Sequence, residues 1–331
     1  MSTLLSPLKI GIIGTGYAAQ KRWRSLQTTP ATQVVAIASH SLDRCLTLDP
    51  HHQAAHYDQW SALLQHRPLD LVIIANANHL HGIIAHAALT TGLHVVCEYP
   101  LALDIQLARE LVALAQTQQR LLHVEHIELL GSLHQTVRQH LPSLGRPIYA
   151  QYTTLSPKQP VSRRWNYHHQ EFGFPLMAAL SRLNRFVDLF GEVAQVSCQA
   201  QFADIPDTPY YRACLCSAQL RFRQGLIATI TYGKGEWFSG SERSLIIHGD
   251  RGSLSFQGNQ GILTQGEQQT PLTLGSRRGV FAKDLQYIVD HLKADAPLYT
   301  TAAASCFALE VAQAASDSAR LGKTIQLSRN R

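Results

Sequence analysis

Short apolar runs alternate with amphipathic segments along the first 125 residues of the chain. The apolar runs predict buried β-strands near residues 10–13, 34–38, 71–75, 94–98 and 121–125. Between these runs, apolar residues recur at helical spacing and predict helices near residues 17–28, 79–91 and 104–119. Strands and helices that alternate in this way indicate an α/β domain with a doubly wound parallel sheet.

The pattern changes after about residue 127, where apolar and polar residues alternate singly and short glycine turns separate the runs. This alternation is typical of an antiparallel sheet. Strands are predicted at Ile148–Leu155, Ala194–Phe202, Ala213–Phe222, Leu226–Tyr232, Ser244–His248 and Ser253–Phe256. Helices are predicted at about Pro175–Phe190, 279–293 and 301–320, and the polar stretch Gln257–Gln269 is expected to be a hairpin loop.

A chain of 331 residues is long enough for two domains of ordinary size. We predict a Rossmann domain at residues 1–126 and an α+β domain with a large antiparallel sheet at residues 127–331. The outer face of that second sheet is either a dimer interface or solvent surface, and the sequence leaves the oligomeric state open.

The first predicted strand runs directly into a Gly-x-Gly-x-x-Ala turn that opens a helix. Its residues are Gly14, Thr15, Gly16, Tyr17, Ala18 and Ala19. Gly14 allows a tight turn, Gly16 lets the backbone approach a pyrophosphate, and Ala19 is small enough for the helix to pack on the strand. The alternative is an ordinary glycine turn, but the second apolar strand about twenty residues later favours a dinucleotide site.

The end of the second strand indicates which dinucleotide is bound. NAD enzymes usually place an acidic residue there to bind the ribose hydroxyls. Here the strand is followed by Ser39, His40 and Ser41, with Arg44 close behind, and Asp43 lies too far along to replace the missing acid. Hydroxyl, imidazole and guanidinium groups suit a 2′-phosphate, so NADPH is expected to bind better than NADH. The alternative is a solvated loop.

Two further strand ends carry polar residues. Loops at the carboxyl ends of parallel strands face the ligand in a doubly wound sheet. Ala75, Asn76, Asn78 and His81 follow the third strand, and Glu98 and Tyr99 follow the fourth. We expect these residues to flank the nicotinamide.

Composition narrows the functional classes. Charged residues make up 16% and hydrophobic residues 45%, with no apolar run of eighteen residues and no charged-then-apolar leader before Lys9, so a soluble cytoplasmic protein without membrane contact is expected. The six cysteines form no Cys-x-x-Cys pair, which favours reduced core thiols over disulfides or a metal site.

The formal net charge of +6 comes from basic residues scattered singly along the chain, a pattern that does not indicate nucleic-acid binding. Of the 29 basic side chains 22 are arginine, which binds carboxylates through paired hydrogen bonds. A small anionic substrate therefore fits better than nucleic acid, although a biased base composition of the gene would give the same excess of arginine over lysine.

The order of motifs, with an Asn-x-x-His turn, a Glu-x-Pro turn and then an antiparallel sheet, resembles the Gfo/Idh/MocA family of NAD(P)-dependent oxidoreductases over nearly the whole chain. In that family a lysine in the Glu-Lys-Pro turn and a later Asp and His accept the proton from a sugar hydroxyl. Here Tyr99 replaces the lysine, Ser181 stands at the Asp position and Arg185 at the His position. A sugar dehydrogenase is therefore disfavoured, because alcohol oxidation needs a proton acceptor.

Several longer segments resemble the biliverdin reductase branch of that family, especially its cyanobacterial form. They are Glu98–Leu103, His123–Leu130, Arg164–Leu176 and Ala179–Phe186. The resemblance implies that biliverdin IXα is the substrate and that NADPH reduces its C10 bridge to give bilirubin while a pyrrole nitrogen is protonated.

The resemblance also implies roles for particular side chains. Arg182 is expected to assist the protonation, with Arg185 on the same helical face. Since the pKa of arginine is above about 12, Arg182 is expected to orient a water or hold a propionate while solvent supplies the proton. The alternative for both arginines is an ion pair with Asp188 or another carboxylate.

Glu98 is expected to accept hydrogen bonds from the nicotinamide carboxamide, with Tyr99 and His126 as donors in the same pocket. His126 at a strand end is equally well explained as a structural residue whose tautomer Glu125 fixes. The adjacent pair His168 and His169 is weak evidence for a metal site, and no metal is expected.

A planar substrate with two carboxylates also suggests stacking and guanidinium contacts. The expected substrate-binding residues are Arg163, Arg164, Trp165, Tyr167, His168, Arg182 and Arg185. The alternative is that the aromatic residues are core anchors. The pair Arg277 and Arg278 either shields the cofactor or solvates a surface turn.

Two other functions remain open at this point. One is an NADP-dependent dehydrogenase of a sugar or inositol, which the fold alone supports. The other is a regulator that binds NADP without turnover, which would also explain the lost catalytic residues.

Overall fold

The computed structural model describes residues 6–328, which form two compact units. The first unit runs to Ile127 and also includes Gly279–Cys306; the second comprises Glu128–Arg278 and the chain that follows from Phe307. The sequence predicts a single division after residue 126. The structure differs because the segment 279–306 returns to the first unit, and no periodicity in the sequence reveals which sheet this segment packs against.

The first unit contains a six-stranded parallel sheet in the order β3-β2-β1-β4-β5-β6. Its strands are β1 (Leu8–Ile13), β2 (Thr32–Ala38), β3 (Ala55–Tyr57), β4 (Leu71–Ile74), β5 (His94–Cys97) and β6 (Leu122–Val124). This is the doubly wound order, which confirms the predicted fold of the domain. The ligand crevice of such a sheet lies where β1 and β4 diverge, at the carboxyl ends of the strands.

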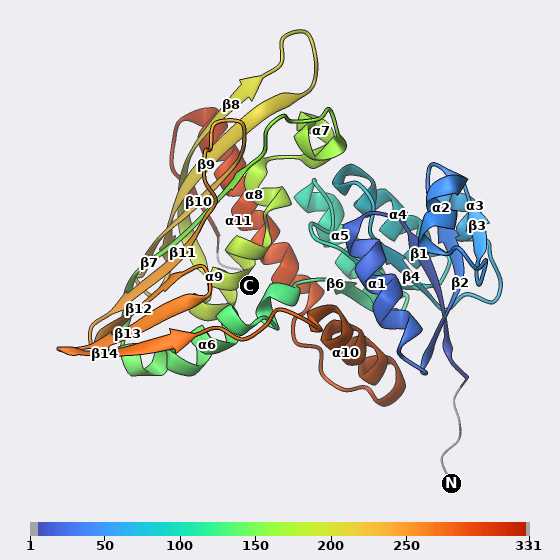
Figure 1. The fold of residues 1–331 in the computed structure, drawn as a ribbon, viewed down its shortest axis with the longest axis horizontal. Helices are drawn as coiled ribbons and strands as arrows, with labels where there is room; N and C mark the ends of the chain where they lie inside the picture. Colours follow the sequence, from blue (N-terminus) through green and yellow to red (C-terminus); the bar gives the residue numbers. More distant parts are fainter. Residues whose placement is uncertain (1–5, 329–331) are drawn as a thin grey trace. The chain divides into compact units, whose positions relative to one another are not determined.

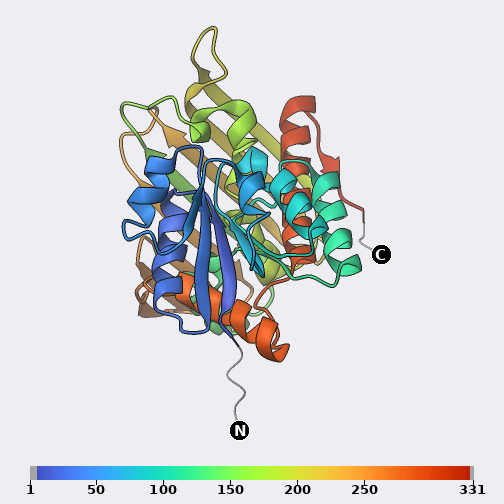
Figure 2. The same ribbon diagram turned by 90° about the vertical axis from the view of Figure 1, so that its right-hand side faces the viewer.

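Helices lie on either side of these parallel strands (Figures 1 and 2). They are α1 (Tyr17–Gln27), α2 (Leu42–Leu48), α3 (Trp60–Leu63), α4 (Asn78–Thr90), α5 (Ile105–Thr117) and α10 (Val280–Ala294). The short elements α2, α3 and β3 are absent from the predictions, because three to seven residues are too few to show a period. Among the described residues, no helix is both long enough and apolar enough to span a bilayer.

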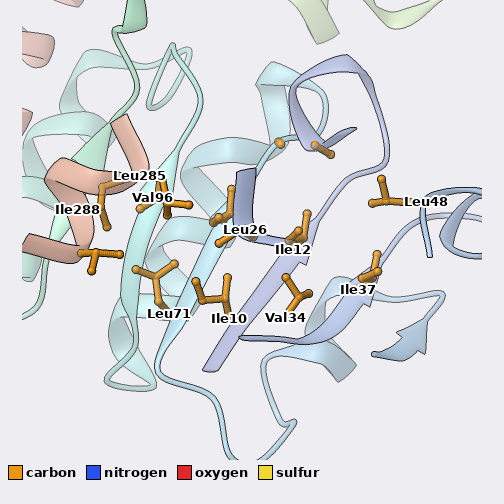
Figure 3. Packing of buried hydrophobic residues seen from close by; sticks show 14 of the residues in the cluster. Ile10, Ile12, Leu26, Val34, Ile37, Leu48, Leu71, Val96, Leu285 and Ile288 are labelled. Carbon is orange, nitrogen blue, oxygen red and sulfur yellow. The ribbon is translucent and has the colours of Figure 1, made fainter. Parts of the chain in front are cut away.

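The core of the first unit explains why α10 joins it. Ile10 and Ile12 of β1 point to one side of the sheet, where Leu285 and Ile288 of α10 are buried in the same cluster (Figure 3). Each side chain of this kind contributes about 1.5–3 kcal/mol when it leaves water. The packing therefore fixes α10 against the parallel sheet, far in sequence from the residues it covers.

The second unit is built on a nine-stranded sheet in the order β14-β13-β12-β11-β7-β10-β9-β8-β15. The strands are β7 (Pro147–Pro157), β8 (Val193–Asp204), β9 (Tyr211–Phe222), β10 (Ile227–Gly235), β11 (Glu242–Gly249), β12 (Gly252–Gln257), β13 (Gln260–Gln265), β14 (Gln268–Thr273) and β15 (Ile325–Gln326). The sheet is mixed and mostly antiparallel, since β7 and β10 pair in parallel.

The prediction of a hairpin loop at Gln257–Gln269 is wrong. This stretch contains β13 and the start of β14, which pair with each other as an antiparallel ribbon at the edge of the sheet. Most of its side chains face solvent, so the segment has polar residues where a buried strand would have apolar ones. The polar composition of these strands therefore resembles that of a loop, and the prediction missed them.

The helices of the second unit lie along one face of this sheet (Figure 1). They are α6 (Ser132–His140), α7 (His169–Phe172), α8 (Pro175–Ala178), α9 (Ser181–Phe190) and α11 (Ala302–Leu321), and the division between the units falls within α11. The single helix predicted at Pro175–Phe190 is two helices, because Ala179 leaves the helical region at φ −101° and ψ 29°. The buried Phe186 of α9 packs against Tyr152 of β7, with ring centroids 6.3 Å apart.

Candidate active site

The glycine turn after β1 has the geometry that a dinucleotide requires. Gly14 has φ +113°, and a Cβ on it would stand 2.2 Å from the carbonyl oxygen of Ala75. Gly16, which precedes α1, has no heavy atom within 4 Å of the place where a Cβ would stand, and no side chain caps the helix there. Ala19 is fully buried under the helix. The open N-terminus of α1 can therefore receive a pyrophosphate, while Tyr17 and Ala18 occupy its first turn.

The residues after β2 lie next to this turn. The hydroxyl of Ser39 is 3.2 Å from that of Thr15. Ser41 is the N-cap residue of α2, and His40 and Arg44 are exposed beside it. The structure thus brings Ser39 to the glycine turn and leaves an imidazole and a guanidinium free to approach a phosphate on the ribose.

The loops after β4 and β5 are joined by His81 of α4. Its Nδ1 lies 2.8 Å from the Pro100 carbonyl oxygen and its Nε2 3.2 Å from that of Asn76. The ring is buried, and this burial lowers its pKa. His81 therefore holds the two loops together, and Asn78 is buried at the start of the same helix. The Ala75 N–H donates to the Ile13 carbonyl and joins the loop to the end of β1.

Glu98 and Tyr99 each contact a further side chain, Arg22 for Glu98 and His126 for Tyr99. The Glu98 carboxylate accepts a hydrogen bond of 2.9 Å from Nε of Arg22 on α1. Tyr99 stacks on His126, with ring centroids 5.6 Å apart and the planes within 3° of parallel. Arg22 is the missed residue here, and its spacing from Ala19 and Leu26, which are both buried, is the signal that could have found it.

His126 is fully buried, with Nε2 2.8 Å from the hydroxyl of Ser305. The expectation that Glu125 fixes its tautomer is wrong, because the Glu125 carboxylate accepts from the backbone N–H of Ile127. Burial lowers the pKa of His126 to about 3, and the neighbouring His123 adds to the effect. His126 is thus a neutral, internally bonded residue near neutral pH.

In the second unit, Arg182 of α9 lines a pocket of about 490 Å³. Its guanidinium lies 3.4 Å from the Thr154 hydroxyl, 3.0 Å from the Ser181 hydroxyl and 5.3 Å from the ring centroid of Tyr232. The remaining lining residues are Glu128, Tyr152, Leu155, Ser156, Ser241, Glu242, Arg243, Gln257, Gly258 and Arg277. Hydroxyl and guanidinium groups dominate this wall.

Glu128 collects three arginines at the same pocket. Arg185 lies 3.1 Å and Arg243 3.3 Å from its carboxylate, and Arg277 pairs with it as well. Burial alone would raise the pKa of Glu128, but Arg185, Arg277 and Arg243 outweigh it and lower that pKa. Arg182, Arg243 and Arg277 line the pocket with two carboxylates, Glu128 and Glu242, and Arg185 lies behind Glu128. The pocket and the buried arginine behind it therefore carry excess positive charge.

The two arginines of α9 differ in their surroundings. Arg185 is 1% exposed and its guanidinium lies over the ring of Tyr152, at 5.5 Å from the centroid. The alternative of an ion pair with Asp188 or another carboxylate is confirmed for Arg185, whose partner is Glu128 at 3.1 Å, whereas Asp188 pairs with His134 at 2.9 Å. Glu128 and Arg243 were not singled out by the sequence, because their partners lie more than fifty residues away.

The predicted substrate segment does not line this pocket. Arg163 and Arg164 are exposed, and Trp165 is 39% exposed and packs against Phe172. Tyr167 is buried. Nδ1 of His168 accepts hydrogen bonds from the backbone N–H groups of Gln170 and Glu171 and caps α7. The burial of Tyr167 favours the core-anchor alternative for this residue.

A further residue that sequence analysis missed is Lys234 of β10. It is 5% exposed, and its ammonium donates to the Asn166 carbonyl and lies 4.4 Å from the ring centroid of Tyr167. Burial lowers the pKa of Lys234 to about 7. The alternation of β10 puts it on the same face as Ile230 and Tyr232, which is the signal that could have found it.

Comparison with protein families and known proteins agrees with this geometry. A Gfo/Idh/MocA model described as "oxidoreductase family, NAD-binding Rossmann fold" matches residues 8–126, and one described as "oxidoreductase family, C-terminal alpha/beta domain" matches residues 140–327. Biliverdin reductase from Synechocystis sp. PCC 6803, crystallised with biliverdin and NADP+, is 47% identical, with a TM-score of 0.92 over 94% of this chain and 99% of that one.

Two mammalian proteins are more distant relatives. Biliverdin reductase A of mouse is 29% identical over 187 residues, which are 56% of this chain and 59% of that protein. The human protein is 27% identical over 207 residues, which are 62% of this chain and 65% of that protein. The chain thus spans less than two thirds of either relative.

The buried His126 predicts a pH dependence of stability. Its pKa is about 6.5 when unfolded and about 3 when folded, so the unfolded chain binds the proton first as the pH falls. Its contribution is complete above pH 6.5 and decreases between pH 6.5 and 3. In His126→Asn, the loss of unfolding free energy between pH 7 and 5 should be smaller by about 2 kcal/mol, measured by urea denaturation. The exposed His40→Asn should keep the wild-type loss, and an unchanged loss in His126→Asn would contradict the assignment.

Proposed function

Because this chain belongs to the Gfo/Idh/MocA family of oxidoreductases, we propose that it reduces biliverdin IXα to bilirubin with NADPH, by hydride transfer to the C10 bridge. The observation that carries the proposal is the pocket lined by Arg182, Arg243 and Arg277, in which Glu128 and Glu242 are the carboxylates and the buried Arg185 lies behind Glu128. Its excess positive charge suits a substrate with two propionates. The likeness to a protein crystallised with biliverdin and NADP+ supports the same substrate and cofactor.

The first unit provides a fitting site for NADPH. Bound there, the cofactor would supply the hydride. The open N-terminus of α1 at Gly16 would hold the pyrophosphate. Ser39, His40, Ser41 and Arg44 would surround the 2′-phosphate, and Glu98 would accept hydrogen bonds from the carboxamide.

Arg182 is the side chain that we place against the reacting part of the substrate. Its guanidinium stays charged throughout, because arginine does not lose its proton in proteins. It would therefore stabilise negative charge that develops on the tetrapyrrole and orient a water among the hydroxyls of Thr154 and Ser181, while solvent supplies the proton. Arg185 is too buried for this task and would hold Glu128 and Tyr152 in place.

The dehydrogenase alternative needs a proton acceptor beside the alcohol. Tyr99, Ser181 and Arg185 occupy the positions of the family's acceptor residues, and none of them is a base near neutral pH. His126 is internally bonded, and Lys234 is covered by aromatic rings and does not line the Arg182 pocket. The site therefore favours reduction of an anionic substrate.

The function is tested by an absorbance time course with biliverdin IXα and NADPH. The red band of biliverdin should decay while the blue-absorbing band of bilirubin grows, and neither should change without protein. A parallel course with NADH ranks the cofactors. Binding of NADPH without any spectral change would reject the reductase in favour of the non-catalytic regulator or another substrate.

Replacing Arg182 should lower turnover. We expect Arg182→Ala to reduce kcat with biliverdin roughly 10²-fold, since the charge that stabilises the developing anion is lost. The Kd for NADPH, measured by nucleotide fluorescence, should change less than about twofold. Arg138→Ala, which removes an exposed arginine of the same unit, is the matched control. Normal turnover in Arg182→Ala would exclude this residue from the reaction.

Replacing Arg44 should reveal the cofactor preference. Arg44→Ala should weaken NADPH binding by about tenfold, because a charged hydrogen bond to the 2′-phosphate is lost, and should leave NADH binding unchanged. The exposed Arg24→Ala, at the end of α1, controls for the loss of a positive charge. Equal losses of affinity for NADPH and NADH would show that Arg44 does not bind the 2′-phosphate.

A further inference from the structure

Buried charges of α1 and α10 meet beside Glu98. Arg22 is 1% exposed, and its guanidinium joins two carboxylates. Nε donates to Glu98 at 2.9 Å, and Nη1 donates to Asp284, which is fully buried. Phe281 of α10 covers the guanidinium, with its ring centroid 5.1 Å away. Glu98 is the least buried of the three, at 13% exposure of its side chain.

Asp284 is held in turn by the end of β6 and by Tyr299. His123 lies with Nε2 2.8 Å from the carboxylate, and the Tyr299 hydroxyl donates to it at 2.7 Å. The same hydroxyl accepts from the backbone N–H of His126 at 3.0 Å. The hydrogen bonds thus connect α1, α10 and the ends of β5 and β6 in one network.

The charges in this network fix its arrangement. Burial would raise the pKa of Asp284, but Arg22 and His123 outweigh it and hold that pKa well below its usual range. Glu125 is buried in the same region, and burial together with the charge of Glu98 raises its pKa well above its usual value. Arg22 therefore pairs with two carboxylates. Among the described side chains, Glu98 has no other cation at ion-pair distance, and Asp284 has only the imidazole of His123 besides Arg22.

Stability alone does not explain such a set of buried charges. The cost of removing charges from water often exceeds what the pair returns, and apolar side chains of similar volume serve a core as well. Glu98 stands at the carboxyl end of β5, where ligands bind in a doubly wound sheet. Its backbone N–H is bonded to the Ile74 carbonyl, so the network adds control of the side chain to a backbone that is already fixed.

We propose that Arg22 and Asp284 are positioning residues for the nicotinamide end of the dinucleotide site, where they hold the Glu98 carboxylate in place to accept hydrogen bonds from the carboxamide. This inference rests on the proposed function, which places the nicotinamide at Glu98. It adds that α10, which follows the second unit's sheet in sequence, completes the site of the first unit.

The test compares two ligands that differ at the nicotinamide end. NADPH has the carboxamide, whereas 2′,5′-ADP consists of adenosine with its 2′- and 5′-phosphates and lacks the nicotinamide end. Asp284→Asn and Glu98→Gln should each weaken NADPH binding by about tenfold, which is the effect expected from the loss of one charged hydrogen bond. Both variants should bind 2′,5′-ADP as the wild type does. The double variant should bind NADPH no more than about twofold more weakly than Glu98→Gln alone, because Asp284 acts through Glu98.

Calorimetry gives both dissociation constants, and the exposed neighbour Lys283→Ala is the matched control on α10. Equal losses for NADPH and 2′,5′-ADP in Asp284→Asn would mean a structural role only, and losses that multiply in the double variant would mean independent action. Either result overturns the proposal. If Asp284→Asn does not fold, Tyr299→Phe removes one hydrogen bond from the same carboxylate and should weaken NADPH binding about threefold, with 2′,5′-ADP unaffected.

The outcome is separable from that of the proposed function, because neither ligand requires biliverdin. If the wild type binds NADPH but leaves biliverdin unchanged, the proposed reductase activity is rejected. The comparison of NADPH binding by the single and double variants would still decide the role of Asp284. A wild type that binds 2′,5′-ADP and NADPH equally tightly would overturn the inference, since Glu98 would then contribute nothing to binding.

Discussion

A guanidinium that leaves water must find an opposite charge, because arginine keeps its proton, and this constraint decides where the buried arginines of both units lie. An isolated buried charge costs several kcal/mol, so each buried guanidinium is brought to a carboxylate. In the first unit Arg22 joins Glu98 to Asp284, and in the second Arg185 is held by Glu128. The carboxylates at the two sites are thereby fixed by partners that lie far away in sequence.

The parallel sheet and its glycine turn could be predicted from the sequence because both depend on local rules. Strands buried on two faces are continuous apolar runs, and the φ of +113° at Gly14 excludes a side chain whatever surrounds it. The partners of the ion pairs follow no local rule. Arg22 has the spacing of a buried helical residue, but nothing near it in the chain indicates Asp284, which is 262 residues away. The ribbon of β13 and β14 was missed for the opposite reason, since its exposed polar side chains resemble a loop.

Burial gives the two arginines of α9 different roles, although both are predicted from the same sequence segment. They are three residues apart and share one face of the helix, and the sequence predicts substrate contact for both. Arg182 lines the pocket beside hydroxyl groups, whereas Arg185 lies behind it, fully surrounded and bonded to Glu128. A group that cannot reach solvent can organise a site but cannot contact what enters it, so Arg182, which is only partly buried, is the arginine suited to the substrate.

The excess of arginine also fits the direction of the proposed reaction. Oxidation of an alcohol needs a base, and a base must be able to exist without its proton near neutral pH. Guanidinium groups cannot do so, but they stay cationic while a hydride adds negative charge to a conjugated substrate. Glu128 keeps three of these cations close together, which their mutual repulsion would otherwise oppose. A site lined by arginines therefore disfavours oxidation of an alcohol and favours addition of a hydride to an anionic, conjugated substrate.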